Sequence, residues 1–247
     1  MNLPVTKENI LFLDIETVPE CETFDELSAV KKELFALKTA YQRKPKTVSD
    51  TEITTEEFYE RAGIWAEFGK IVCISVGYFV SNKNERSFRV KSFYGDNEAE
   101  LLIEFKTLLE THFNSAKHVL CGHNAKEFDF PYIARRMIIR RIELPQKLKL
   151  FGKKPWEIPH LDTMELWKFG DYKHYTSLKL LANILEIPSP KEDIDGSQVA
   201  QVYYKEKDVE RIAKYCEKDT IAVAQLFLRY NNEAILEAHE LVFADEK

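Results

Sequence analysis

The run Ile10-Leu-Phe-Leu-Asp-Ile15 is almost wholly apolar, and Thr17-Val-Pro19 ends it. A short apolar run with such a stop is typical of a β-strand that is buried on both faces. Asp14 and Glu16 are two residues apart at the end of this strand, so their side chains point to the same face of the sheet. Burying an unpaired carboxylate among Ile, Leu and Phe is costly, which favours a functional role for the pair. The alternative is a strand-end Asp that caps a turn.

The D-x-E spacing alone is weak evidence. At about 6% for each acid, such a pair arises roughly once by chance in a chain of this length. The look-alikes in this chain are Asp50/Glu52, Asp96/Glu98 and Asp208/Glu210. They lie in polar sequence, so we expect their side chains to be exposed, and the apolar context distinguishes Asp14 and Glu16 from them.

The composition indicates an ordinary globular protein. Of the 247 residues, 45% are apolar and 31% are charged, with 8 Gly and 9 Pro. We therefore expect a buried core and a single domain that spans residues 1–247. The formal net charge of −6 does not indicate a polyanionic partner. It does not exclude one, because bound divalent cations invert the local field where a phosphate would lie.

Cysteine usage and the N-terminus bear on location. The cysteines are Cys21, Cys73, Cys121 and Cys216, scattered and without a CxxC pair. They are typical of reduced core residues and not of disulfides or zinc ligands. The N-terminal segment lacks the basic and apolar regions of a signal peptide, and no stretch approaches about 18 uninterrupted apolar residues. We therefore expect a cytoplasmic protein without membrane contact.

Strand and helix patterns alternate along the rest of the chain. Strand-like runs cover residues 70–79, 87–94 and 118–122, and helical periodicity covers 101–113, 127–141, 163–168, 177–186 and 209–230. Between the first two strands, residues 20–67 form a charged, helical insertion. This order predicts an α/β fold with a mixed sheet flanked by helices.

A second cluster of polar residues follows the strand-like run 118–122. Asn124, Phe128 and Asp129 lie between the end of this strand and the start of the next helix, where open α/β sheets place their sites. The alternative is that Asp129 only stabilises the first turn of its helix.

The third cluster is in the last helix. Tyr215 and Asp219 are four residues apart and share one helical face. The apolar face continues to Phe227, so Asp219 interrupts an apolar stripe, and a carboxylate that faces a core requires a cation or a metal. Tyr204 and Asp208 have the same spacing, but they lie in polar sequence, and Asp208 is well placed to cap the last helix.

Other polar residues have structural interpretations. Asp162 and Glu165 fit a helix-capping arrangement, which we prefer to a catalytic role. No nucleophile pairs with His123, His160 or His174 in the sequence.

Three segments, Asp14-Ile-Glu16-Thr17, Asn124-Ala-Lys-Glu-Phe128-Asp129 and Tyr215-x-x-x-Asp219, resemble the ordered exonuclease motifs of the DEDD superfamily in its tyrosine-bearing (DEDDy) branch. The histidine-bearing branch places His five residues before the last Asp, where this chain has Lys214. The intervening sequence, including Pro188-Ser-Pro-Lys and Asp195-Gly-Ser-Gln, is similar to stand-alone exonucleases related to the proofreading domain of family B DNA polymerases. The resemblance assigns no counterpart to the insertion at 20–67.

The resemblance implies a ribonuclease H-like fold, with a mixed five-stranded sheet of three antiparallel strands followed by parallel strands. It implies 3′-5′ exonuclease activity with two Mg²⁺ or Mn²⁺ ions, and hard carboxylate oxygens suit these ions. Asp14 would bridge the ions, Glu16 and Asp219 would complete the first ion's site, and Asp129 would position the second ion through water. Tyr215 would orient the attacking water, and the product would be a nucleoside 5′-monophosphate.

The substrate is expected to be nucleic acid, in particular the 3′ end of single-stranded DNA. The expected contacts are Thr17, Asn124, Phe128, Arg135 and Arg136, the last two in a basic segment that continues to Lys154. The basic segment could equally be a solvated face. Two alternatives for function remain: a 3′-5′ exoribonuclease that uses the same site, and a catalytically silent nucleic-acid-binding module.

Overall fold

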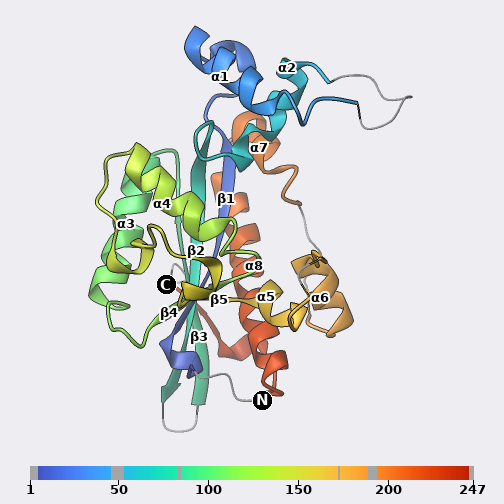
Figure 1. Cartoon of the computed structure of the whole chain (residues 1–247). Helices are drawn as coiled ribbons and strands as arrows, with labels where there is room; N and C mark the ends of the chain where they lie inside the picture. The colour runs from blue at the N-terminus through green and yellow to red at the C-terminus, as the bar shows by residue number, and fades with distance from the viewer. Residues whose placement is uncertain (1–4, 46–52, 83–84, 172, 189–193, 245–247) are drawn as a thin grey trace.

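The computed structural model describes residues 5–45, 53–82, 85–171, 173–188 and 194–244 (Figure 1). In this part of the chain, six strands form one sheet in the order β5-β4-β1-β2-β3-β6. The strands are β1 (Ile10–Pro19), β2 (Gly69–Asn82), β3 (Glu85–Tyr94), β4 (Val119–Gly122), β5 (Leu161–Asp162) and β6 (Leu241–Phe243). β2 pairs antiparallel with both β1 and β3. β4 runs parallel to β1, and β5 runs parallel to β4.

This topology confirms the predicted fold class, a mixed sheet with three antiparallel strands and then parallel ones. The sheet has one strand more than the five predicted. β6 is a three-residue edge strand that pairs in parallel with β3, and so short a segment carries no measurable periodicity in sequence.

β1 lies between two hydrophobic cores. Leu11, Leu13 and Ile15 pack with α3 (Glu98–Thr111) and α4 (Asp129–Ile139) on one face of the sheet. Ile10 and Phe12 pack with α8 (Val209–Tyr230) on the other face, and Figure 1 shows these helices on opposite sides of the sheet. β1 is therefore buried on both faces, as predicted from its sequence.

The shorter helices complete the chain. They include α5 (Thr163–Lys168), α6 (Leu178–Ile184), α7 (Val199–Gln201) and a π-helix at Val202–Glu206 that leads into α8. The helices predicted from periodicity are all present, with ends that differ by a few residues. No helix in the described part of the chain combines the length and the apolar character needed to cross a bilayer.

The insertion between β1 and β2 contains several short helices in its described residues. It contains η2 (Phe24–Glu26), α1 (Ala29–Thr39), α2 (Thr55–Phe58) and η3 (Tyr59–Ile64), and its residues 46–52 lie outside the described residues. A separate small core, centred on Phe35 and Tyr59, holds these pieces together. Figure 1 shows α1 and α2 beyond the end of β1, above α7.

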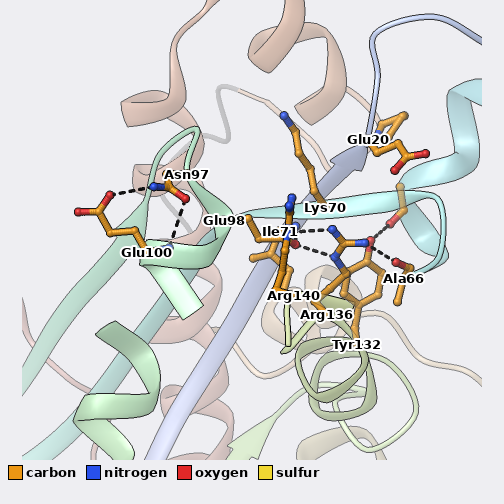
Figure 2. Close-up of polar contacts among 12 residues, drawn as sticks. Glu20, Ala66, Lys70, Ile71, Asn97, Glu98, Glu100, Tyr132, Arg136 and Arg140 are labelled. Atoms are coloured by element: carbon orange, nitrogen blue, oxygen red, sulfur yellow. Dashed lines mark hydrogen bonds and ion pairs between the residues drawn. The ribbon is translucent and has the colours of Figure 1, made fainter. Parts of the chain in front are cut away.

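A buried ion pair connects α3, α4 and β2 (Figure 2). The Glu98 side chain accepts hydrogen bonds from Arg136 Nε at 2.7 Å and Arg136 Nη2 at 2.6 Å. It also accepts from Arg140 Nε at 2.6 Å and from the Ile71 backbone N–H at 2.8 Å. Burial opposes ionisation of Glu98, but the hydrogen bonds and the charge of Arg136 outweigh this effect and lower the Glu98 pKa.

Two predictions from sequence are wrong at this ion pair. Glu98 was expected to be exposed with the other D-x-E look-alikes, yet only 2% of its surface is accessible. Arg136 was expected to contact nucleic acid, yet it is 3% exposed and bound to Glu98. A local sequence pattern could not show that two charged residues 38 positions apart neutralise each other inside the protein.

We predict that Arg136→Ala lowers the free energy of unfolding by about 3 to 5 kcal/mol, because it leaves the buried Glu98 carboxylate without its partner. Arg135→Ala is the matched control, since the neighbouring Arg135 is exposed, and it should change the free energy of unfolding by less than about 0.5 kcal/mol. Urea unfolding followed by circular dichroism measures both. Equal effects of the two substitutions would contradict the assigned role of the ion pair.

Candidate active site

β1 presents two carboxylates to α8. Asp14 and Glu16 continue the alternation of Ile10 and Phe12, so they face the side of the sheet that α8 covers. The exposed fraction of Glu16 is 8%, and Asp14 is partly buried. A shift in the register between β1 and β2 follows immediately, between Glu16 and Thr17. Such irregularities commonly lie next to active sites.

α8 brings Tyr215, Cys216 and Asp219 to these carboxylates. The Cys216 Sγ lies 3.3 Å from the Asp14 backbone oxygen and 3.4 Å from Asp14 Oδ2. One potential ligand atom each from Asp14, Glu16 and Cys216 lies within 4.8 Å of the other two. The Tyr215 hydroxyl hydrogen-bonds to the Asp219 carboxylate.

Asp129 reaches the same place from α4, of which it is the first residue. It is 4% exposed, and its carboxylate accepts a hydrogen bond from the backbone N–H of Ile15, the residue between Asp14 and Glu16. The structure therefore brings together side chains from all three segments that the sequence singled out.

The carboxylates raise one another's pKa. Burial is the largest cause for Asp14, whose pKa lies well above its usual value, and the charge of Asp219 is the next largest. The pKa of Glu16 is also well above its usual value, through burial first and then the charge of Asp219. Burial raises the pKa of Asp129 to about 7, although hydrogen bonds from backbone N–H groups oppose this shift.

This cluster fits divalent cations. Several carboxylates that are buried together repel one another, and a bound cation removes that repulsion. Carboxylate oxygens are the ligands that Mg²⁺ and Mn²⁺ prefer. Asp14, Glu16, Asp129 and Asp219 are therefore suited to hold such ions.

Asp162, which sequence reasoning assigned only to a helix cap, has a second role. It caps α5 as predicted, accepting from the Met164 N–H at 2.9 Å. Its carboxylate also accepts from the Asn124 N–H at 2.9 Å and the Lys126 N–H at 3.0 Å, so it fixes the turn that leads to Asp129. Its position at the carboxyl end of β5, beside that of β4, is the signal that could have revealed this role.

Of the residues that were expected to contact substrate, the structure places some beside Glu16 and others away from it. Thr17 and Phe128 line a hollow that also contains Glu16. Asn124 has a positive φ of 60°, and its buried Oδ1 has no hydrogen-bond partner among the described residues. Arg135 is exposed but does not line this hollow, and Arg136 is bound to Glu98. Neither arginine of the basic segment that was expected to contact substrate therefore lines this hollow.

A family model described as a predicted 3′-5′ exonuclease related to the exonuclease domain of PolB matches residues 64–240. This range includes Asp129, Tyr215 and Asp219 but begins after β1, which the sheet places beside them. No curated protein matches the sequence.

Among solved structures, the chain is similar to the family B DNA polymerase from the hyperthermophilic archaeon Pyrobaculum calidifontis, with a TM-score of 0.51 and 13% sequence identity. The alignment covers 89% of this chain and 24% of the polymerase chain. At this identity the similarity concerns the fold, and it agrees with the predicted ribonuclease H-like architecture.

We predict that Asp129→Asn stabilises the metal-free protein by an amount that grows with pH. A native pKa of about 7 exceeds the value near 4 of an unfolded Asp. The neutral carboxyl of the native state therefore contributes stability below about pH 4, and this contribution is lost as the pH rises to about 7. Asn does not ionise, so the variant should gain about 4 kcal/mol over wild type across this interval, at about 1.4 kcal/mol for each pH unit between the two pKa values.

Thermal unfolding in the presence of a chelator, measured between pH 4 and pH 8, tests this prediction. Asp25→Asn is the control, because the Asp25 side chain is 89% exposed and lies in the insertion. A stability difference between Asp129→Asn and wild type that does not change with pH would contradict the assignment.

Proposed function

The chain belongs to the family of predicted 3′-5′ exonucleases related to the exonuclease domain of PolB, and from this premise we propose that it hydrolyses single-stranded DNA from its 3′ end to nucleoside 5′-monophosphates. The observation that carries the proposal is that Asp14 lies close enough to Asp219, Asp129 and Glu16 for their charges to raise its pKa, with the Tyr215 hydroxyl hydrogen-bonded to Asp219. These groups come from β1, α4 and α8, in the order expected from the resemblance.

The four carboxylates are proposed to hold two divalent ions, Mg²⁺ or Mn²⁺. Such ions supply a water of lowered pKa and neutralise the charge that develops on the phosphate. The raised pKa values of Asp14, Glu16 and Asp129 support this proposal, because these acids are arranged to lose protons when a cation is present.

Tyr215 is proposed to orient the water that attacks the phosphodiester. Burial first, and the charge of Asp219 next, raise the pKa of the Tyr215 hydroxyl above its usual value, so this group keeps its proton at neutral pH. Because its single O–H donates to Asp219, its oxygen can fix a water molecule by accepting a hydrogen bond, and it does not act as a strong base. Asp219, to which it is hydrogen-bonded, holds the hydroxyl in place.

Cys216 is proposed to orient Asp14. Its thiol is buried, and burial raises the pKa well above its usual value, so it remains a neutral donor. The contacts with the Asp14 backbone oxygen and Oδ2 restrict the rotation of the Asp14 side chain.

RNA is the second candidate substrate. The hydrolysis does not itself distinguish the two sugars, and recognition of a 2′-hydroxyl depends on contacts outside the carboxylate cluster. A silent binding module is disfavoured because all four carboxylates are present, and the charges of Asp219, Asp129 and Glu16 all act on Asp14.

We predict that wild type shortens 5′-labelled single-stranded DNA in Mg²⁺ or Mn²⁺, and that a chelator stops the reaction. Asp14→Ala and Asp219→Ala should each lower kcat by about 1,000-fold or more, because each removes a carboxylate from the cluster. Asp208→Ala is the matched control, since Asp208 has the same spacing to Tyr204 but caps α8. Labelled RNA of the same sequence, run in parallel, distinguishes the two substrates.

Equal digestion by wild type, Asp14→Ala and Asp219→Ala would refute the proposed site. Digestion of RNA but not DNA would retain the site and replace the substrate.

We predict that Tyr215→Phe lowers kcat by about 10- to 100-fold with little change in KM, because the lost hydroxyl positions water and does not bind the strand. Tyr204→Phe is the control, as the Tyr204 hydroxyl donates to the Pro19 backbone oxygen at 2.5 Å and not to a site carboxylate. Steady-state kinetics on a labelled oligonucleotide measure both. If Tyr215→Phe raised KM and left kcat unchanged, the positioning role would be wrong.

A further inference from the structure

A hollow of about 440 Å³ opens beside Glu16. One part of its lining is formed by two residues that were expected to contact substrate, Thr17 near the end of β1 and Phe128 just before α4. The other part comes from segments to which the proposed function gives no role: η3 of the insertion, with Arg61 and Ile64, and the turn before α7, with Ser197. The volume lies within the range of about 300 to 1,000 Å³ that is typical of pockets for small ligands.

Arg61 gives this hollow a cation. Its guanidinium group lies over the Phe58 ring, 5.4 Å from the ring centroid, and the residue is exposed. Among the described residues, no carboxylate forms an ion pair with it, although Glu60 and Glu16 line the same hollow. A guanidinium without a carboxylate partner retains its donors for a planar or tetrahedral anion, and phosphate is the anion to which its geometry is best suited.

The segment that carries Arg61, η3 and the residues that follow it, is fixed to β1 and α4. Gly63 packs so closely on β1 that a Cβ there would lie 3.1 Å from the Val18 carbonyl carbon. The Tyr132 hydroxyl donates to the Gly63 backbone oxygen at 2.7 Å, and Arg136 Nη1 donates to the Ala66 backbone oxygen at 2.6 Å. Figure 2 shows Tyr132 and Arg136 reaching this segment from α4.

The apolar lining fits a nucleobase. Ile64 leaves 54% of its surface exposed although it is a large aliphatic residue at the hollow. Phe128 lines the hollow with its ring partly buried and packs on Tyr132, with the ring centroids 5.3 Å apart. Aromatic and aliphatic surfaces bind unpaired bases with little dependence on sequence.

From these contacts we infer that the insertion builds the subsite for the 3′-terminal nucleotide, in which Arg61 binds a phosphate of the strand end and Ile64 and Phe128 contact the base. This inference rests on the proposed function and names what the insertion adds to it. The cation for the strand end therefore comes from η3, ahead of β2, and not from Arg136 of the basic segment.

Steady-state kinetics on single-stranded oligonucleotides test the inference. Arg61→Ala should raise KM by about tenfold or more and change kcat by less than about threefold, since a charge-assisted contact to the bound strand is lost. Arg61→Lys should give an intermediate KM, because it keeps the charge without the bidentate geometry. Lys44→Ala is the control for charge, as Lys44 is an exposed cation of the insertion that does not line the hollow.

Two further measurements separate a phosphate contact from a structural effect. The slope of log KM against log salt concentration should be smaller for Arg61→Ala than for Lys44→Ala, by roughly 0.7 for one lost phosphate contact. Ser197→Trp, a substitution at an exposed position on the hollow, should fill the subsite and lower kcat/KM by about tenfold or more while the unfolding temperature stays the same.

The outcomes are distinguishable. An inactive wild type refutes the proposed function itself. An active wild type with the same KM in Arg61→Ala and Lys44→Ala, or with a loss confined to kcat, refutes the subsite and leaves the proposed function standing.

Discussion

The two-sided burial of β1 is the constraint on which the rest of the structure depends. A strand with a helical layer on each face gives its polar side chains little contact with water, so Asp14 and Glu16 must be satisfied largely by protein groups or by a cation. The alternation of the strand directs both to the face of α8, where Cys216 contacts Asp14 and where Tyr215 and Asp219 lie. The site is thus a consequence of placing acids in a strand that has no exposed face.

The ion pair between Glu98 and Arg136 holds the surroundings of that strand. It joins α3 to α4, and Arg136 extends the connection to the Ala66 backbone at the end of the insertion. A charged pair at this depth requires nearly complete hydrogen bonding, and the Ile71 N–H and Arg140 supply the remaining donors. As a result, the helix that begins with Asp129 and the segment that carries Arg61 are anchored to the same carboxylate.

Much of the fold and of the candidate site follows from local sequence patterns. The apolar context of β1 and the four-residue spacing of Tyr215 and Asp219 depend only on periodicity, and both are visible in the sequence. The pairing of Arg136 with Glu98 depends on contacts between distant segments, so local polarity gave the wrong expectation for both residues. Arg61 carried no signal, because it becomes relevant only when η3 packs against the end of β1.

The wide separation of the site's residues along the chain has a consequence for folding kinetics. The first carboxylate is at residue 14 and the last at residue 219, with the insertion between β1 and β2. Packing of α8 on β1 across such an interval must overcome the entropy of closing a long loop, and topologies with distant contacts fold slowly. A growing chain on the ribosome therefore has no complete acid cluster until residue 219 has emerged and α8 has packed on β1, so the proposed activity cannot appear before α8 has been made.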